Sequence, residues 1–166
     1  MNCNNCNSCS KKCEDKKEGC LRCHLKGMKV SFDTVFNLTK PYLKNTLGQF
    51  QYYLCTNPKC NVAYYTLNGR EIITNDILCD IWFKQPRKKF MVCYCRDISL
   101  DDVVFAVNRL DTYTIPKIVH FLQKSDIETN CIMNNPTGES CDKLFLNAIE
   151  YAKKIKLIKW GEEYEF

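Results

Sequence analysis

The spacing of its cysteines constrains this chain more than any other feature of the sequence. Of the 13 cysteines, only Cys79 stands apart from a close group. The groups are Cys3, Cys6, Cys9 and Cys13; Cys20 and Cys23; Cys55 and Cys60; Cys93 and Cys95; and Cys131 and Cys141. Tetrahedral metal ions and iron–sulfur clusters take cysteine ligands in pairs, from short loops that meet in space. The spacing therefore predicts a metal-binding protein.

Length and charge limit the classes of partner that such a protein can bind. The chain has 166 residues, which suit one domain or two small fused ones, and its formal charge is only +5. Because nucleic-acid binding needs a denser basic face, we expect no nucleic-acid partner. No apolar run approaches the roughly 20 residues that cross a bilayer, and the polar first residues lack a secretory apolar segment. We therefore expect no membrane contact and a cytoplasmic location, where clustered cysteines bind metals more often than they form disulfides.

Local patterns predict strands in the first half of the chain. Residues 49–54, 61–67 and 70–74 are rich in aromatic and β-branched side chains, and the turn pair Asn68-Gly69 separates the last two runs. A short extended stretch is expected over residues 28–32. A helix is expected from Asp33, and the proline at position 41 should end it.

Helices dominate the prediction for the second half. The charged run 84–90 is interpreted as a connector, and an extended MVCYC stretch follows it. Ser99 and Asp102 resemble a capping box that opens a helix. Further helices are expected from Thr114 and from Asp142, with a loop rich in Asn, Pro and Gly over 129–141 between them.

The first predicted metal site consists of Cys20, Cys23, Cys55 and Cys60. A C-x-x-C pair directs both thiolates at one ion, and the C-x4-C pair supplies the other two corners of a tetrahedron. Four thiolates are typical of a closed structural Zn²⁺ site. Two alternatives remain at this point: His24 replaces one cysteine as a ligand instead of facing solvent, or the four cysteines are free thiols.

The second predicted site consists of Cys93, Cys95, Cys131 and Cys141. The C-x-C pair suits one iron of a binuclear 2Fe–2S cluster, and the Cys131/Cys141 pair suits the other. Backbone N–H groups near Gly138 are expected to approach the sulfurs. Helices that begin just after Cys95 and Cys141 would direct their positive ends at an anionic cluster. A second zinc ion is the alternative.

These motifs together resemble a known family. The motifs are C-x4-C followed by VAYY, VCYC followed by a capped helix, and C-x3-NPTGESC leading into a helix. They resemble the N-terminal domain of CopZ-type copper chaperones over about residues 20–155. Within that domain, the second half is similar to the 2Fe–2S domain of bacterioferritin-associated ferredoxins.

The resemblance implies the contents of both sites. It implies a 2Fe–2S cluster on Cys93, Cys95, Cys131 and Cys141. It also implies zinc on Cys55 and Cys60, with the remaining ligands from the Cys20/Cys23 region. Full-length members continue into a heavy-metal-associated domain with its own copper-binding C-x-x-C. The sequence ends at Phe166 without that motif, so we expect the zinc and redox module alone, a module connected in the family with reduction of Cu(II) to Cu(I).

The N-terminal cysteines have the C-x2-C-x2-C-x3-C spacing of a bacterial 4Fe–4S run, at Cys3, Cys6, Cys9 and Cys13. Glu14 stands where such runs have proline, and the polar residues between the cysteines cannot seal a cluster from water. Three hypotheses remain: an exposed thiolate tail that binds Cu⁺ or Zn²⁺, a disordered tail, and a third cluster.

The expected fold class is therefore α+β, with a small zinc-stapled antiparallel sheet and a helix followed by a mainly helical 2Fe–2S-binding subdomain. The expected boundaries are a Cys-rich flexible tail (1–19), the zinc-binding half (20–90), the cluster-binding half (91–157) and a C-terminal tail (158–166). We expect a one-electron carrier in copper handling, with a redox or copper-transport protein as partner, and not an enzyme. The alternative is a non-redox zinc- or copper-binding metallochaperone or interaction module.

Overall fold

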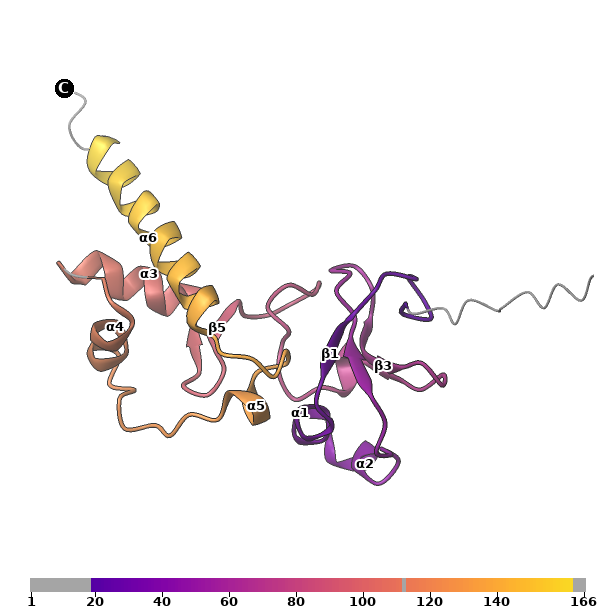
Figure 1. Ribbon diagram of the computed structural model, residues 1–166. Coiled ribbons are helices and arrows are strands. Elements are labelled where there is room, and N and C mark those ends of the chain that lie inside the picture. Colours follow the sequence, from indigo (N-terminus) through magenta and orange to yellow (C-terminus); the bar gives the residue numbers. More distant parts are fainter. Residues whose placement is uncertain (1–18, 112, 163–166) are drawn as a thin grey trace, which may run out of the picture.

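The computed structural model describes residues 19–111 and 113–162 as two packed halves (Figure 1). A sheet with two short helices forms the first half, and helices α3, α4 and α6 gather in the second. This arrangement confirms the predicted α+β fold class. The N-terminal cysteines Cys3, Cys6, Cys9 and Cys13 lie outside the described residues, as does the predicted tail apart from Gly19.

The first half is built on a four-stranded antiparallel sheet in the order β1-β2-β3-β4. Its strands are β1 (Met28–Val30), β2 (Tyr52–Leu54), β3 (Val62–Thr66) and β4 (Glu71–Ile73). The predicted turn before β4 is present, and Gly69 has the positive φ of +99° that such a turn favours in glycine. All five residues of β3 are buried, so this strand forms the centre of the first half.

Two short helices and one 3-10 turn complete this half: α1 (Phe32–Leu38), α2 (Pro41–Lys44) and η1 (Thr74–Asp76). Helix α1 begins earlier than predicted because Ser31, and not Asp33, is its N-cap, accepting a hydrogen bond from the backbone N–H of Thr34. Its buried side chains Val35 and Leu38 pack against the sheet.

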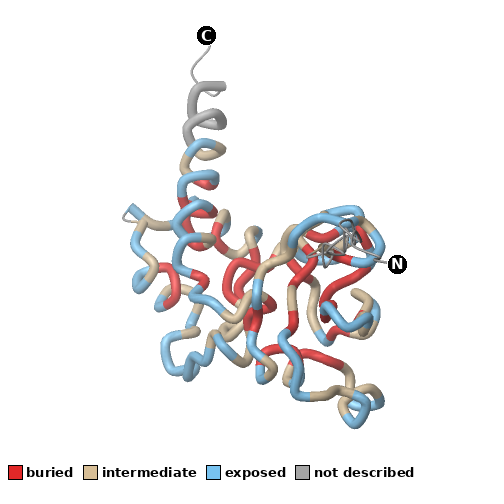
Figure 2. Tube along the Cα trace, turned by 45° about the vertical axis from the view of Figure 1, so that its right-hand side comes forward, coloured by how far each residue is buried: buried red, intermediate tan, exposed pale blue. Residues whose placement is uncertain are grey.

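The second half pairs a small hairpin with four helices. Its elements are β5 (Met91–Cys93), β6 (Ile98–Ser99), α3 (Leu100–Arg109), α4 (Ile115–Phe121), α5 (Cys131–Asn134) and α6 (Asp142–Glu162). The predicted capping box is present, since Ser99 and Asp102 each bond the other's backbone N–H. Helices α3 and α6 pack together over a core that includes Val103, Val107 and Ile149. Figure 2 shows buried segments in both halves.

Helix α3 begins at Leu100, where the capping box predicted it, and β6 lies between this helix and Cys95. Two elements differ from the prediction. The predicted loop over 129–141 contains α5, whose first residue is Cys131. Helix α6 continues beyond Leu157 to Glu162, within the segment for which a tail was predicted.

Hydrogen bonds join the two halves. The Thr34 hydroxyl and the Asn37 amide, both on α1, donate to the carbonyls of Ile132 and Met133 on α5, each across 2.7 Å. Figure 1 shows α5 next to α1, away from the other helices of its half. Helix α5, which begins with Cys131, is thus hydrogen-bonded to helix α1 of the first half.

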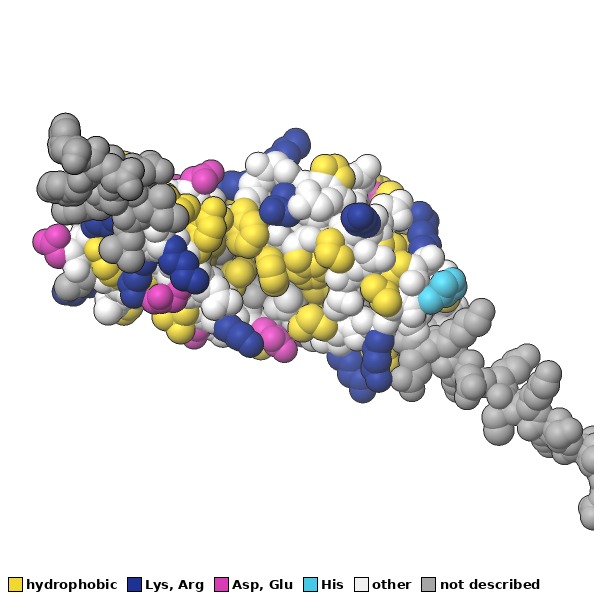
Figure 3. All heavy atoms as spheres, turned by 90° about the horizontal axis from the view of Figure 1, so that it is seen from above, with side chains coloured by type: hydrophobic (Ala, Val, Ile, Leu, Met, Phe, Trp, Pro, Cys, Tyr) yellow, Lys and Arg dark blue, Asp and Glu magenta, His cyan; other side chains and the backbone are white. Residues whose placement is uncertain are grey.

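The described helices include none with the length and apolarity to cross a membrane. On the face shown in Figure 3, Lys and Arg side chains are spread among apolar and acidic ones and do not form one continuous basic patch.

Candidate metal centres

The first cysteine pair lies on a tight loop ahead of β1. The backbone N–H of Cys20 donates to the Leu25 carbonyl, and the His24 N–H donates to the Cys20 carbonyl. A Cβ on Gly19 would collide with the carbonyl oxygen of His24, so only glycine fits this close approach. The loop therefore turns back on itself and presents both thiols on the same side.

The second cysteine pair lies on the loop between β2 and β3. The Cys55 N–H donates to the Ala63 carbonyl, and the Cys60 N–H donates to the Asn57 carbonyl. The Asn57 side chain also accepts from the Lys59 N–H, which is the Asx-turn chemistry that bends a short loop. Cys55 and Cys60 consequently flank a compact turn at the end of the sheet.

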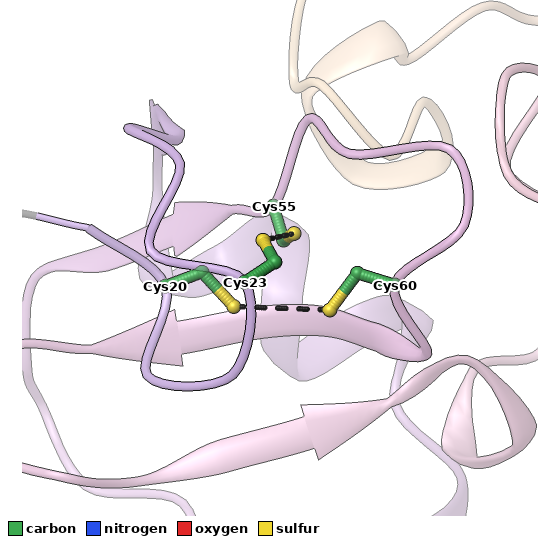
Figure 4. Close-up of side chains that lie close together, drawn as sticks. All are labelled: Cys20, Cys23, Cys55 and Cys60. Atoms are coloured by element: carbon green, nitrogen blue, oxygen red, sulfur yellow. Dashed lines mark hydrogen bonds between the residues drawn. The ribbon is translucent and has the colours of Figure 1, made fainter.

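These two loops bring four sulfurs together (Figure 4). The Sγ atoms of Cys20 and Cys60 are 3.9 Å apart, those of Cys23 and Cys55 are 3.5 Å apart, and all four lie within 4.8 Å of one another. Four sulfurs at ~2.3 Å from one tetrahedral Zn²⁺ would be about 3.8 Å apart. The predicted quartet therefore fits a single zinc ion. His24 is exposed and outside this group.

The thiols of this quartet differ in acidity. Burial raises the pKa of Cys55 to about 12 and also raises the pKa of Cys20. Desolvation acts on Cys23 as well, but this thiol is less buried. Its hydrogen bonds with the Leu25 backbone and the Cys55 thiol together outweigh desolvation and lower the pKa of Cys23 to about 7. Metal binding needs thiolates, so zinc would displace protons chiefly from the buried members.

Arg22, inside the CLRC loop, attaches the first pair to the sheet. Its guanidinium donates to a Glu71 carboxylate oxygen on β4 at 2.8 Å and to the Asn61 amide oxygen at 2.9 Å. The two cysteine loops are thereby linked through side chains as well as through the proposed ligands.

The second set of cysteines is arranged as two pairs. The Sγ atoms of Cys95 and Cys131 are 4.0 Å apart, and Cys93 interacts with the Cys141 thiol. Each pair thus takes one cysteine from the 93/95 loop and one from the 131/141 segment, whereas the sequence favoured Cys93 with Cys95 and Cys131 with Cys141. Among the described residues, these four do not form a quartet as compact as the first.

A binuclear cluster needs two pairs of ligands, one pair for each metal, whereas a single tetrahedral ion needs all four sulfurs around one point. A cavity of about 220 Å³ lies here, lined by Cys93, Cys131, Cys141 and Arg96 among others. The thiol of Cys141 is the main cause that lowers the pKa of Cys93 to about 6, and Arg96 adds to this shift. Conversely, the same contact and burial raise the pKa of Cys141. The donor set therefore suits a binuclear cluster.

Three residues beside these sites were not predicted. Arg22 was hidden between two predicted ligands, and Lys84 begins the run interpreted as a connector. Asn135 is buried and donates its side-chain amide to the Cys141 sulfur at 3.4 Å and to the Glu139 carbonyl at 2.6 Å. The sequence predicted backbone donors near Gly138 for this role. Only the Asn-Pro pair in the loop indicated that Asn135 has a special conformation.

Cys79 is separate from both sites. It packs against the core of the first half beside a cavity of about 320 Å³, and it does not belong to the compact sulfur quartet. Burial, with a contribution from Asp80, raises the pKa of its thiol to about 12. Cys79, the cysteine that stands apart from the groups in the sequence, is thus a packing residue of the first half.

The fold and the compact quartet define a small α+β protein with a zinc-binding sheet. Residues 17–78 match the CopZ family model described as a zinc binding domain. No curated protein matches the chain.

The fold is also similar to a solved structure, the CopZ N-terminal domain from Archaeoglobus fulgidus, with a TM-score of 0.61 at 20% sequence identity. The match covers 78% of this chain and 95% of the other. That share is larger than residues 17–78 can supply, so the likeness of fold continues into the helical half.

Proposed function

We propose that the protein is a cytoplasmic one-electron carrier of copper handling that holds one structural zinc and one 2Fe–2S cluster. The observation that carries the redox part is the division of the second cysteine set into two pairs, with 4.0 Å between the sulfurs of Cys95 and Cys131. A zinc site needs one compact quartet, as the first set provides, while a binuclear cluster needs two ligands for each iron.

The zinc site has a structural role in this proposal. Cys20, Cys55 and Cys60 are buried, and the four sulfurs close the tetrahedron without an open corner for substrate. The ion would join the loop ahead of β1 to the turn between β2 and β3. It would thereby stabilise a sheet whose strands are only three to five residues long.

The second set would hold a 2Fe–2S cluster, which when bound supplies a one-electron couple. The chain's own residues prepare the site for negative charge. Arg96 lies beside Cys93, and the Asn135 amide donates to the Cys141 sulfur. Helix α6 begins at Asp142, directly after Cys141, so its positive end faces this ligand.

The proposed electron acceptor is Cu(II) or a redox or copper-transport protein, so the protein would act as a carrier and not as an enzyme. The similarity of residues 17–78 to a CopZ family supports the link to copper. Thiol ligands require a reducing compartment, and the nine cysteines of the described residues are free thiols. The N-terminal cysteines would add soft ligands for Cu⁺.

The test is metal analysis and spectroscopy of protein purified without oxygen. The proposal expects one zinc, two irons and two acid-labile sulfides per chain, with visible absorption that bleaches on reduction. Dithionite should produce the paramagnetic signal of a singly reduced cluster. The variant Cys131→Ser should lose iron and keep zinc, Cys60→Ser should lose zinc, and Cys79→Ser should keep both. A colourless protein with two zinc ions would instead establish the non-redox metallochaperone or interaction module.

Copper itself needs a separate measurement. When reduced protein is mixed with Cu(II) in the presence of a Cu(I)-specific chelator, it should yield one Cu(I) per reduced cluster. The variant Cys131→Ser should yield only the Cu(I) that its free thiols produce. Equal Cu(I) yields from both proteins would remove the redox link to copper and leave the cluster assignment intact.

A further inference from the structure

Lys84 is a buried cation beside the zinc quartet, and the residue is only 2% exposed. The ammonium donates to three backbone carbonyls, those of Asn57 at 2.9 Å, Cys60 at 3.2 Å and Val62 at 2.8 Å. An ammonium has three donors, so the three carbonyls satisfy all of them. Lys84 thus holds the turn that carries Cys60 from the inside.

The polypeptide around Lys84 strengthens this hold. The backbone N–H of Gln85 donates to the Pro58 carbonyl at 2.8 Å, so two consecutive residues contact the same turn. The first two residues of the segment interpreted from sequence as a connector are therefore hydrogen-bonded to the Cys55–Cys60 loop. A neutral side chain with fewer donors would leave buried carbonyls without partners.

The charge of Lys84 needs a separate explanation. None of the ion pairs among the described residues includes Lys84, and carbonyls alone compensate a buried ammonium poorly. Four thiolates on one Zn²⁺ carry a net charge of two minus. The Lys84 ammonium bonds the backbone carbonyl of Cys60, which is one of the four proposed ligands. The buried cation and the anionic zinc site are therefore complementary.

We propose that Lys84 is a positioning residue of the zinc site, which holds the Cys55–Cys60 loop and the start of β3 through three carbonyls and balances the negative charge of the zinc–thiolate centre. This inference rests on zinc binding by the four cysteines. It adds a residue outside the cysteine pairs, contributed by the segment that leads toward β5.

The test compares the zinc affinity of wild type with Lys84→Gln and Lys84→Arg by chelator competition. Gln keeps two donors without the charge, and Arg keeps the charge with altered geometry. Lys59→Gln is the matched control, since Lys59 lies on the same turn and is exposed. We expect Lys84→Gln to bind zinc about 10- to 100-fold more weakly, Lys84→Arg to retain most of the affinity, and Lys59→Gln to match wild type.

Measuring Lys84→Gln again in a second variant of the zinc site separates the effect of charge from that of packing. In Cys23→His, a neutral ligand replaces one thiolate and the site carries one negative charge less. The penalty of Lys84→Gln should be several-fold smaller in this background, and the absorption of a bound Co²⁺ reports whether the ligand set is intact. An equal penalty in both backgrounds would overturn charge balancing.

The outcomes are distinct. If Lys84→Gln does not fold with zinc while Lys84→Arg folds and binds it, the charge requirement is supported. If both variants are unfolded, or both are weakened equally, Lys84 has a packing role only and the inference is wrong. If wild type binds no zinc, the zinc assignment itself fails; if Lys84→Gln binds as tightly as wild type, only the role of Lys84 fails.

Discussion

The Tyr64 hydroxyl donates a hydrogen bond to the Pro136 carbonyl across 2.9 Å, between residues 72 positions apart in the chain. Tyr64 is the buried centre of β3, and Pro136 belongs to the loop that precedes Cys141. The strand of the zinc-binding half therefore supports the segment that carries ligands of the proposed cluster.

Replacement of Tyr64 by Phe tests this support. The change removes one hydroxyl and leaves the buried Pro136 carbonyl without its donor, so we expect a loss of about 1–3 kcal/mol in the free energy of unfolding. Urea unfolding measures it, with Tyr151→Phe on the exposed face of α6 as control. Zinc content should stay at the wild-type level. Equal stability of the two variants would show that the contact does not join the halves energetically.

Gly138 should not tolerate alanine. Its φ of +71° disfavours any Cβ by roughly 1–2 kcal/mol, and the added Cβ would lie 2.9 Å from the Thr34 hydroxyl oxygen. We expect Gly138→Ala to destabilise the protein, and to cost less when Thr34→Ala is already present. Gly69→Ala has positive φ without any atom within 4 Å, so its cost should not depend on Thr34. Thermal unfolding of the single and double variants gives these comparisons; strict additivity for Gly138 would contradict the contact.

The contribution of Cys79 to the free energy of unfolding should change at alkaline pH. Its folded-state pKa is raised to about 12, mainly by burial, whereas an unfolded cysteine has a pKa of about 8.5. A raised folded-state pKa contributes stability that is complete below about pH 8.5 and declines as the pH rises toward 12. The stability difference between wild type and Cys79→Ala should therefore shrink over this range. Urea unfolding at a series of pH values measures it, and parallel profiles would be the opposite result.

Asn135 is expected to tune the reduction potential of the proposed cluster. Its amide donates to the Cys141 sulfur, and such a bond is stronger when the sulfur carries more negative charge in the reduced state. Asn135→Ala should lower the potential by on the order of tens of millivolts. The neighbouring Asn134 bonds the Asn130 carbonyl instead, so Asn134→Ala is the matched control. Redox titration followed by visible absorption measures both variants, and an unchanged potential in Asn135→Ala would show that this donor does not act on the cluster.

Local signals made much of the fold predictable. The β3–β4 turn at Asn68-Gly69 and the capping box of Ser99 and Asp102 depend on residues within a few positions, and both are present. The start of α1 was misplaced by a similarly local choice, because Ser31 competes with Asp33 for the cap and precedes it.

The sites were predictable as sets of residues and not as arrangements. Spacing brought out the eight cysteines, but it could not show that Cys93 faces Cys141 instead of Cys95, since that pairing depends on the whole packing of β5 against α6. Helix α5 was missed for a related reason. Its carbonyls are bonded by Thr34 and Asn37, which lie 98 and 96 positions away, and no local pattern records such distant donors.

The placement of those two donors has a practical consequence for dissecting the protein. A fragment that begins at β5 would contain all four proposed cluster cysteines and would still lack the side chains that anchor α5. Its Cys131 would then sit at the start of a four-residue helix without external bonds, too short to persist by itself in water. Excising the helical half for study would therefore remove part of the support of Cys131, a ligand of the proposed cluster.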